Sequence, residues 1–399
     1  MYASYVPNLR FPEFQGEWEM YSFNDIAQYK KGPFGSALKK EIFVPQSADA
    51  IKIYEQQNAI KKDWELGRYY ISKDYFINHM QQFVVKAGDI IVSCAGTIGE
   101  IYELPQNATS GVFNQALMRV RINTSLIDKN IFIIVFSSMI DSFSKIYSNG
   151  SAIKNIPPFA DLKKTNVFLP TKNEQYKISK FISLLDERIA TQNKIIDKLQ
   201  SLIKGISNQL LYANNGISVR LGDILIERSE RTKENNQHEV LSSTVKGIFT
   251  QREYFSKDIA SENNVGYKVV RLHDVVLSPQ NLWMGNINYN NKFDIGIVSP
   301  SYKVFSIAVG YDKEYIAALL KTHRALYNYM LVSEQGASIV RRNLNMEEFE
   351  QLTFKLPPIE RQERIGHTIS KLKLRLAFAY NQKTMYEKQK QYLLRQMFI

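Results

Sequence analysis

The amino-acid sequence contains an internal repeat, which constrains the fold more than any other feature of the chain. Three short segments of the first half recur in the same order in the second half, at separations of 185, 186 and 187 residues. A nearly constant offset indicates a duplicated structural unit, here of about 190 residues. The paired segments are Lys86–Ser93 with Arg271–Ser278, Ser148–Ile153 with Glu334–Ile339, and Phe168–Ile178 with Lys355–Ile365.

A long helical pattern follows the Leu-Pro pair that ends each half. Apolar residues recur there in alternating steps of three and four, which is a heptad pattern, and no proline interrupts either run. Each run covers about 40 residues and predicts a helix about 60 Å long. The seam residues are Ile182, Leu185, Ile189, Gln192, Ile196, Leu199, Ile203, Ile206 and Leu210 in the first run, and Ile369, Leu372, Leu376, Ala379, Lys383, Tyr386, Lys390, Leu393 and Met397 in the second.

Two such helices in one chain are expected to bury their seams against each other. The alternative is that each helix packs only on its own globular domain. Lys383 and Lys390 weaken the second seam. Their alkyl chains can pack along the seam while the ammonium groups reach water, the helix pair can separate there, or the two cations can face an acidic group.

The sequence pattern divides the chain into four segments. Residues 1–170 and 217–358 are predicted to form mixed α/β domains, while 171–214 and 359–399 form the two long helices, the first ending near Asn214-Asn215-Gly216. Strand-like runs such as Asp89–Ser93 and Val269–Ser278 lie between turn signals such as the Lys31-Gly-Pro-Phe-Gly35 segment.

Outside the shared segments, the two halves differ strongly. Gly32–Phe43 has no similar stretch near Glu227–Gln237. Two halves that share these segments but differ between them predict two structurally related domains that recognise different targets.

The positive charge of the chain is concentrated in the two helical segments. The formal net charge is +12, of which residues 171–213 contribute +3 and residues 359–399 contribute +6. A basic stripe of this kind attracts polyanions, and nucleic acid is the usual partner. From charge alone, a solvated face or a basic protein interface is about equally plausible.

The single cysteine, Cys94, excludes an intrachain disulfide and a zinc site made of four thiolates. Residues 1–10 lack the basic start and apolar run of a signal peptide, and the most apolar stretch, Ile131–Phe136, is too short to cross a bilayer. We therefore expect a cytoplasmic protein.

The sequence motifs that would indicate an enzyme are absent, or are displaced by one residue from the position that the chemistry requires. The sequence has no Gly-x4-Gly-Lys-Ser/Thr and no Gly-x-Gly-x-x-Gly segment, and Gly96-Thr-Ile-Gly99 leads into an extended stretch rather than a helix. Asn155-Ile-Pro-Pro-Phe159 resembles the Pro-Pro motif of adenine-N6 methyltransferases. However, Ile156 occupies the position that must accept the adenine amino hydrogen, so a loop is the better interpretation. The five histidines have no metal-ligand spacing, so we expect no metal site.

These features together resemble the specificity (S) subunits of type I restriction-modification systems, over nearly the whole chain. The resemblance rests on Gly88-Asp-Ile-Ile-Val-Ser93, Gly96-Thr-Ile-Gly99, Asn114-Gln115, and Leu169-Pro170 followed by Glu174-Gln175, with a long helix closing each half. The second half departs from the family pattern at Glu360-Arg361-Gln362 and at Ser278–Gly285, which replaces the Gly-x-x-Gly turn.

The resemblance implies a pseudo-twofold, non-catalytic protein with two DNA target-recognition domains. They would be separated by two long helices that form an antiparallel coiled coil, and each would recognise half of a split, asymmetric site in double-stranded DNA. The helices would fix the spacing between the half-sites. Two modification subunits would supply S-adenosylmethionine and adenine-N6 methylation. A restriction subunit would supply ATP- and Mg-dependent translocation and cleavage.

Candidate DNA-binding residues are cations, amides and hydroxyls in predicted loops, because base edges need paired donors and acceptors while phosphates need cations. For each cation taken singly, solvated surface is the plainer interpretation. The first domain contributes Lys30, Lys31, Ser36, Lys39, Lys40, Thr97, Gln115 and Lys154, and the second contributes Arg228, Arg231, Lys233, Gln280, Asn281, Trp283, Arg341 and Arg342.

Two other classes of function compete with DNA recognition. A stand-alone methyltransferase or nuclease would need one of the motifs that are missing above. The other is a coiled-coil scaffold with two protein-binding domains, from which a DNA reader would differ by ligand binding that depends on salt and on DNA sequence.

Overall fold

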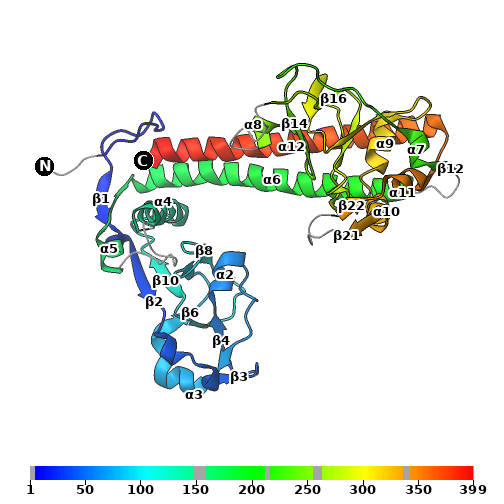
Figure 1. Ribbon diagram of the computed structural model, residues 1–399. Coiled ribbons are helices and arrows are strands. Elements are labelled where there is room, and N and C mark those ends of the chain that lie inside the picture. Colours follow the sequence, from blue (N-terminus) through cyan, green and yellow to red (C-terminus); the bar gives the residue numbers. More distant parts are fainter. Residues whose placement is uncertain (1–4, 148–158, 212–215, 255–262, 336–341, 399) are drawn as a thin grey trace. The chain divides into compact units, whose positions relative to one another are not determined.

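The computed structural model describes residues 5–147, 159–211, 216–254, 263–335 and 342–398. The chain forms two compact units (Figure 1). Unit 1 comprises Met1–Ile189 and Met385–Ile399, and unit 2 comprises Ala190–Thr384. Each unit therefore combines one globular domain with part of both long helices.

Unit 1 is built around two sheets. A four-stranded antiparallel sheet has the order β2-β10-β7-β8, a five-stranded sheet has the order β3-β5-β4-β9-β6, and β1 pairs with β11. The strands are β1 (Glu19–Ser22), β2 (Ala27–Lys31), β3 (Phe43–Val44), β4 (Ile51–Tyr54), β5 (Tyr70–Ile71), β6 (Val84–Val85), β7 (Ile90–Ser93), β8 (Ile101–Glu103), β9 (Gly111–Phe113), β10 (Leu117–Ile122) and β11 (Asn166–Leu169). The helices are α1 (Phe23–Ile26), α2 (Gln56–Lys61), α3 (Lys73–Tyr75), α4 (Lys129–Tyr147) and α5 (Phe159–Lys164).

Unit 2 repeats the four-stranded frame, in the order β13-β20-β17-β18, and β12 pairs with β23 as β1 pairs with β11. The strands are β12 (Ile217–Arg220), β13 (Leu225–Glu227), β14 (Leu241–Thr244), β15 (Gly247–Thr250), β16 (Lys268–Arg271), β17 (Val275–Leu277), β18 (Ile287–Tyr289), β19 (Ile295–Val298), β20 (Lys303–Ile307), β21 (Ser333–Gln335), β22 (Arg342–Leu344) and β23 (Thr353–Leu356). The helices are α7 (Leu221–Ile224), α8 (Gln251–Tyr254), α9 (Lys313–Leu319), α10 (His323–Leu331) and α11 (Met346–Gln351).

The matching strand orders confirm the mixed α/β class and the internal repeat. The units differ where the sequences differ. The five-stranded sheet of unit 1, whose strands lie between β2 and β10 in the sequence, is replaced in unit 2 by the separate pairs β14-β15 and β16-β19, which lie between β13 and β20. A further pair, β21-β22, follows α10.

One predicted strand is wrong in extent. The run Val269–Ser278 is divided into β16 and β17 by a turn at His273, whose φ of 75° lies in the left-handed region. The Asp274 side chain stabilises this turn by accepting a hydrogen bond of 2.8 Å from the Arg271 amide. Such short polar side chains favour turns because they offer the backbone a local hydrogen bond.

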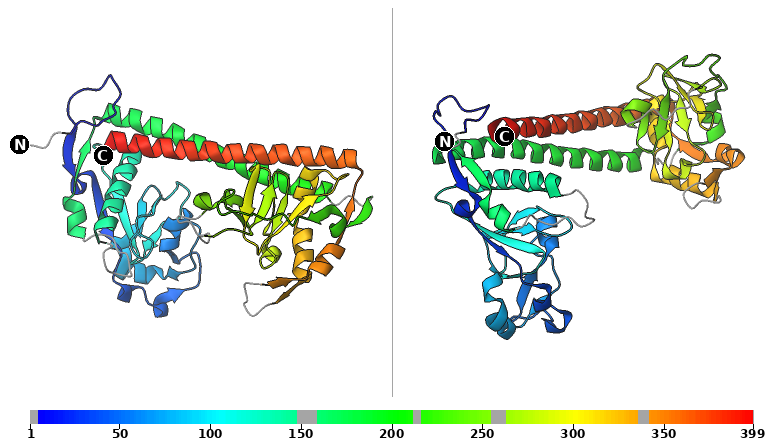
Figure 2. Two further views of the ribbon diagram at one scale, coloured as in Figure 1. Left: turned by 45° about the horizontal axis from the view of Figure 1, so that its top comes forward. Right: turned by 60° about the vertical axis from the view of Figure 1, so that its left-hand side comes forward.

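The two long helices are α6 (Lys172–Leu210) and α12 (Ile359–Phe398). Figures 1 and 2 show them side by side. In unit 1, Lys390 donates to Asp186 at 2.5 Å, and in unit 2, Gln192 donates to Gln382 at 3.0 Å. From the first pair to the second, the α6 partner moves forward by six residues while the α12 partner moves back by eight, which is the antiparallel arrangement. Lys390 thus faces an acidic group, one of the three expectations for it.

The heptad pattern holds in both helices, because each of the ten apolar seam residues predicted to pair the helices is buried or half-buried. They are Ile182, Leu185, Ile189, Ile196, Leu199, Ile203, Ile369, Leu372, Leu376 and Leu393. The ends of the seam also belong to the domain cores: Ile182 packs with the core of unit 1 and Ile369 with that of unit 2. Pairing of the helices and packing on the domains therefore occur together.

Candidate nucleic-acid interface

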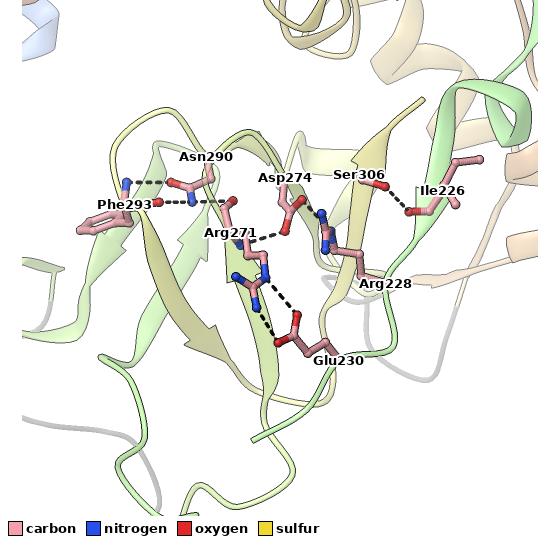
Figure 3. Close-up of polar contacts among 8 residues, drawn as sticks. All are labelled: Ile226, Arg228, Glu230, Arg271, Asp274, Asn290, Phe293 and Ser306. Carbon is pink, nitrogen blue, oxygen red and sulfur yellow. Dashed lines mark hydrogen bonds and ion pairs between the residues drawn. The ribbon is translucent and has the colours of Figure 1, made fainter. Parts of the chain in front are cut away.

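The aspartate of the repeated Asp-Ile-Ile or Asp-Val-Val segment is a structural residue in both units. Asp89 accepts hydrogen bonds from the Arg121 guanidinium at 2.6 and 2.9 Å. Asp274 accepts one from Arg228 at 2.9 Å, and its side chain is only 2% exposed (Figure 3). Burial raises the pKa of Asp274, although its hydrogen bonds with Arg271 and Arg228 oppose this rise.

The glutamine that follows each Leu-Pro pair is structural as well. The Gln175 amide donates to the carbonyl oxygens of Pro170 and Leu126, and its oxygen accepts from the Asp128 amide just before α4. Gln362 repeats this arrangement, donating to Pro357 at 2.8 Å and accepting from the Asp312 amide at 3.2 Å. These segments recur because they connect the long helices to the frame. Target contacts are therefore expected where the units differ.

In unit 1, the structure brings two groups of predicted residues together. Gly32 packs directly on the backbone of Asn114, where an added Cβ would lie 2.0 Å from the carbonyl oxygen. The next turn follows at Gly35, whose position for a Cβ lies 3.9 Å from the Gln115 amide nitrogen. The loop 30–40 and Gln115 thus form one surface, beside a groove of about 660 Å³ lined by Lys30, Lys31, Ser36 and other residues.

The predicted cations of this loop have different surroundings. Lys30 is half-buried, donates to Gln82 at 2.8 Å and lies 5.1 Å from the centre of the Phe83 ring. Lys31, Lys39 and Lys40 are exposed, as is Ser36. The exposed lysines can reach a phosphate backbone, whereas Lys30 also helps to hold the wall of the groove.

Thr97 lies outside this groove. It is exposed in the turn after β7, where its carbonyl oxygen accepts a hydrogen bond of 2.9 Å from Gln56. The turn closes through the Gly99 amide, which donates to Ser93 at 2.9 Å. Gly96 and Gly99 both have positive φ, which explains the glycines of this segment.

In unit 2, four of the predicted residues lie together. The Arg342 guanidinium is 4.8 Å from the centre of the Trp283 ring, and the Arg342 amide donates to the Gln280 carbonyl at 3.2 Å. Asn281 precedes the short 3-10 turn Leu282–Met284 that carries the tryptophan. The indole nitrogen of Trp283 is buried and has no hydrogen-bond partner among the described residues. This cluster combines a cation, an aromatic ring and two amides.

Three further described cations predicted for unit 2, Arg228, Arg231 and Lys233, have different surroundings. Arg228 is engaged by Asp274, as described above. Arg231 is exposed and donates to the Gly266 carbonyl at 2.8 Å, and Lys233 is exposed. Lys154, Arg341 and residues 155–158 lie outside the described residues, so their predicted roles stay predictions.

The residues of the groove in unit 1 that sequence reasoning missed include Phe34, His79 and Gln82. The Phe34 side chain is 90% exposed. The only signal for it was an aromatic residue inside a glycine-proline turn. His79 and Gln82 come from a segment about 50 residues away along the chain, and no local pattern connects that segment with the loop.

The described part of the chain contains neither a metal-binding cluster nor a helix suited to a membrane. No group of three or more His, Cys, Asp or Glu side chains is placed to hold a metal ion. Likewise, none of its helices combines the length and the apolar character that crossing a membrane requires.

Comparisons with known proteins agree on one family. Residues 15–201 match the family model described as type I restriction modification DNA specificity domain. The specificity subunit of the type I restriction enzyme MjaVIII from Methanocaldococcus jannaschii is 24% identical over 216 residues, which are 51% of this chain and 43% of that protein. The aligned region thus spans less than half of that relative's length.

Two solved structures match nearly the full length of the chain. The crystal structure of a type I restriction-modification S subunit from M. genitalium has a TM-score of 0.59 at 15% identity, with 99% of both chains covered. A structure from a study of complex assembly and conformational transition of the type I restriction-modification system has a TM-score of 0.53 at 14% identity, covering 96% of this chain and 97% of that one. At these identities the likeness shows the fold.

Proposed function

Because residues 15–201 match the family model described as type I restriction modification DNA specificity domain and the chain shares the fold of a solved type I S subunit, we propose that this protein is the DNA-recognition subunit of a type I restriction-modification complex. One observation carries the proposal. The two units share their frame and its buried polar contacts, but they differ in the exposed loops that bear cations, amides and aromatic rings. Such a molecule has two recognition surfaces of different specificity.

In this function, each unit recognises one half of a bipartite, asymmetric DNA site. Loop cations contact phosphates and set the position of the protein, while amides and hydroxyls contact base edges. The paired helices fix the length of the unrecognised spacer between the two halves. The chain itself is non-catalytic in this proposal. Two modification subunits supply S-adenosylmethionine and adenine-N6 methylation, and a restriction subunit supplies ATP- and Mg-dependent cleavage.

The outer faces of the helices support docking of the modification subunits. On α12, Leu374, Phe378, Met385 and Tyr392 are 61–72% exposed. Their spacing of four, seven and seven residues places them on one face of the helix. On α6, Leu184, Ile195 and Leu202 are 39–51% exposed and also share one face. Apolar faces of this size on both helices indicate a protein partner.

The test is to express the chain with its modification subunit and to map N6-methyladenine across the host genome. We expect a split motif of two unequal short halves around a fixed gap, which is absent when this chain is omitted. If the two proteins associate but no methylation follows, the coiled-coil scaffold is the better explanation. If the same motif is methylated without this chain, another protein sets the specificity and the proposal is wrong.

A further inference from the structure

Phe34 is the most exposed aromatic side chain in the described part of unit 1, at 90%. Leaving an apolar ring of this size in water forgoes the stabilisation that burial would bring. Single exposed apolar residues are common on protein surfaces, so exposure by itself does not indicate a ligand. The loop that carries Phe34, however, is anchored at several points.

The anchors lie on both sides of Phe34. Before it, the Gly32 amide donates to Leu117 at 2.9 Å, and the same glycine packs on the Asn114 backbone. After it, the Ala37 amide donates to the Phe34 carbonyl at 2.9 Å, and the Tyr75 hydroxyl donates to the Ala37 carbonyl at 2.8 Å. The backbone is thus fixed so that the ring points into solvent. A pre-ordered loop loses little conformational entropy when it binds a ligand.

The groove beside the ring is lined by apolar side chains, among them Pro33 and Tyr75, together with cationic and polar ones. Lys31 lines the same groove as Phe34, and exposed Lys39 and Lys40 follow it in the loop. Gln82 and His79 line that groove too, and both carry hydrogen-bonding groups. The three exposed lysines beside the groove favour a polyanion as the partner.

This set of groups fits the major groove of DNA. Cations can contact phosphates, and an amide can bond to base edges. The one apolar group that a base pair presents in the major groove is the 5-methyl group of thymine, and a phenyl ring is a suitable partner for it.

We propose that Phe34 determines specificity at one position of the half-site bound by unit 1, by packing against a thymine 5-methyl group. The inference rests on the proposed function and goes beyond it by naming the base feature that is recognised. Every half-site that contains a methylated adenine also contains its paired thymine, so a target for Phe34 is present in each half.

The experiment removes the methyl group from the DNA and the ring from the protein, separately and together. The complex with modification subunits is used, with duplexes that carry the methylated motif. Each thymine of both half-sites is replaced in turn by deoxyuridine, which lacks only the 5-methyl group. Dissociation constants are measured for the wild type, Phe34→Ala and the conservative variant Phe34→Leu. Met20→Ala, which alters another exposed apolar residue on β1, is the control.

For the wild type, we expect one deoxyuridine substitution to weaken binding about fourfold, the effect of losing one buried methyl contact. Phe34→Ala should weaken binding to the thymine duplex and remove the effect of that substitution. Phe34→Leu should keep part of it, and Met20→Ala should behave as the wild type.

Equal responses of the wild type and Phe34→Ala to every substitution would overturn the inference while leaving the proposed function intact. Weaker binding of Phe34→Ala to all duplexes, without a change in their ranking, would also overturn it, since the ring would then only aid general binding. If the wild-type complex itself does not prefer the motif, the proposed function fails, and the inference fails with it.

Discussion

At the scale of single residues, the repeated polar residues and the candidate recognition residues have different roles. Asp274 and Gln362 are buried and bonded to the frame, as are their equivalents in unit 1. Buried polar groups of this kind are costly to leave without partners, which explains why both halves keep them. Exposed residues such as Lys31 and Lys233 carry no such constraint and can differ between units.

The Arg228–Asp274 pair separates a structural role from a DNA-binding role. Arg228→Ala leaves the buried Asp274 carboxylate without its guanidinium partner, so we expect a loss of about 1–3 kcal/mol in the free energy of unfolding near neutral pH. Urea denaturation measures this loss. Arg231→Ala is the matched control, because Arg231 is exposed and donates only to the Gly266 carbonyl in the described contacts; its effect should stay within about 0.5 kcal/mol.

The same pair predicts a dependence on pH. Burial places the folded pKa of Asp274 above its unfolded value, so the folded state binds the proton more tightly. The contribution of Asp274 to stability therefore falls as the pH rises from the unfolded to the folded pKa. Arg228→Ala removes an interaction that lowers this pKa, so the fall should be larger and extend to higher pH. An equal loss of stability in Arg228→Ala at all pH values would contradict this account.

At the scale of elements, each long helix has one buried face and a second apolar face that is exposed. Leu185 is 7% exposed and packs in the core of unit 1, whereas its neighbour Leu184 is 51% exposed. Adjacent residues of a helix point about 100° apart, so the heptad phase alone decides which leucine is buried. The proposed function assigns the buried face to folding and the exposed face to partner subunits.

Leu184 and Leu185 form a matched pair for testing this assignment. Leu185→Ala should lower the free energy of unfolding by about 2–5 kcal/mol, because it leaves a cavity in a packed core. Leu184→Ala should leave stability nearly unchanged but weaken association with the modification subunit, measured by titration of the purified proteins. If Leu184→Ala binds the modification subunit as tightly as the wild type, that face of α6 is not the docking surface.

For the whole molecule, the proposed function implies that the two long helices determine the spacing between the two DNA half-sites. The Gln192–Gln382 hydrogen bond marks one point of contact between the two helices. Counted from that pair in the antiparallel sense, residues 193–199 of α6 correspond to residues 375–381 of α12. Each stretch is one heptad, so removing both keeps the seam in phase.

Deletion of both heptads should shorten the unrecognised gap in the methylated motif by about three base pairs. Seven helical residues span about 10.5 Å, and base pairs are about 3.4 Å apart. Mapping N6-methyladenine with the shortened chain measures the gap, and deletion of only one heptad is the control, because it breaks the register and should abolish methylation. Retained methylation with an unchanged gap would mean that the helices do not set the spacing.

The order of residues along the chain was sufficient to predict the duplicated frame, the mixed α/β class and both long helices. A repeat and a heptad pattern are properties of the sequence itself, so local periodicity reveals them without knowledge of the fold. The heptad position of Ile196 predicted its burial, and the residue is 4% exposed. The division of Val269–Ser278 into two strands did not follow, because the turn depends on a side chain bonding its own backbone.

Only the tertiary structure decided which loop residues meet. Arg342 lies over Trp283 although 59 residues separate them, and Gln115 lies beside the turn at Gly35 although 80 residues separate them. The tertiary structure also determines that Arg228 donates a hydrogen bond to the buried Asp274 and that the Phe34 side chain is exposed to solvent. Such contacts depend on how the sheets bring distant loops together, and a side chain's burial and partners are set by those neighbours rather than by its own place in a local pattern.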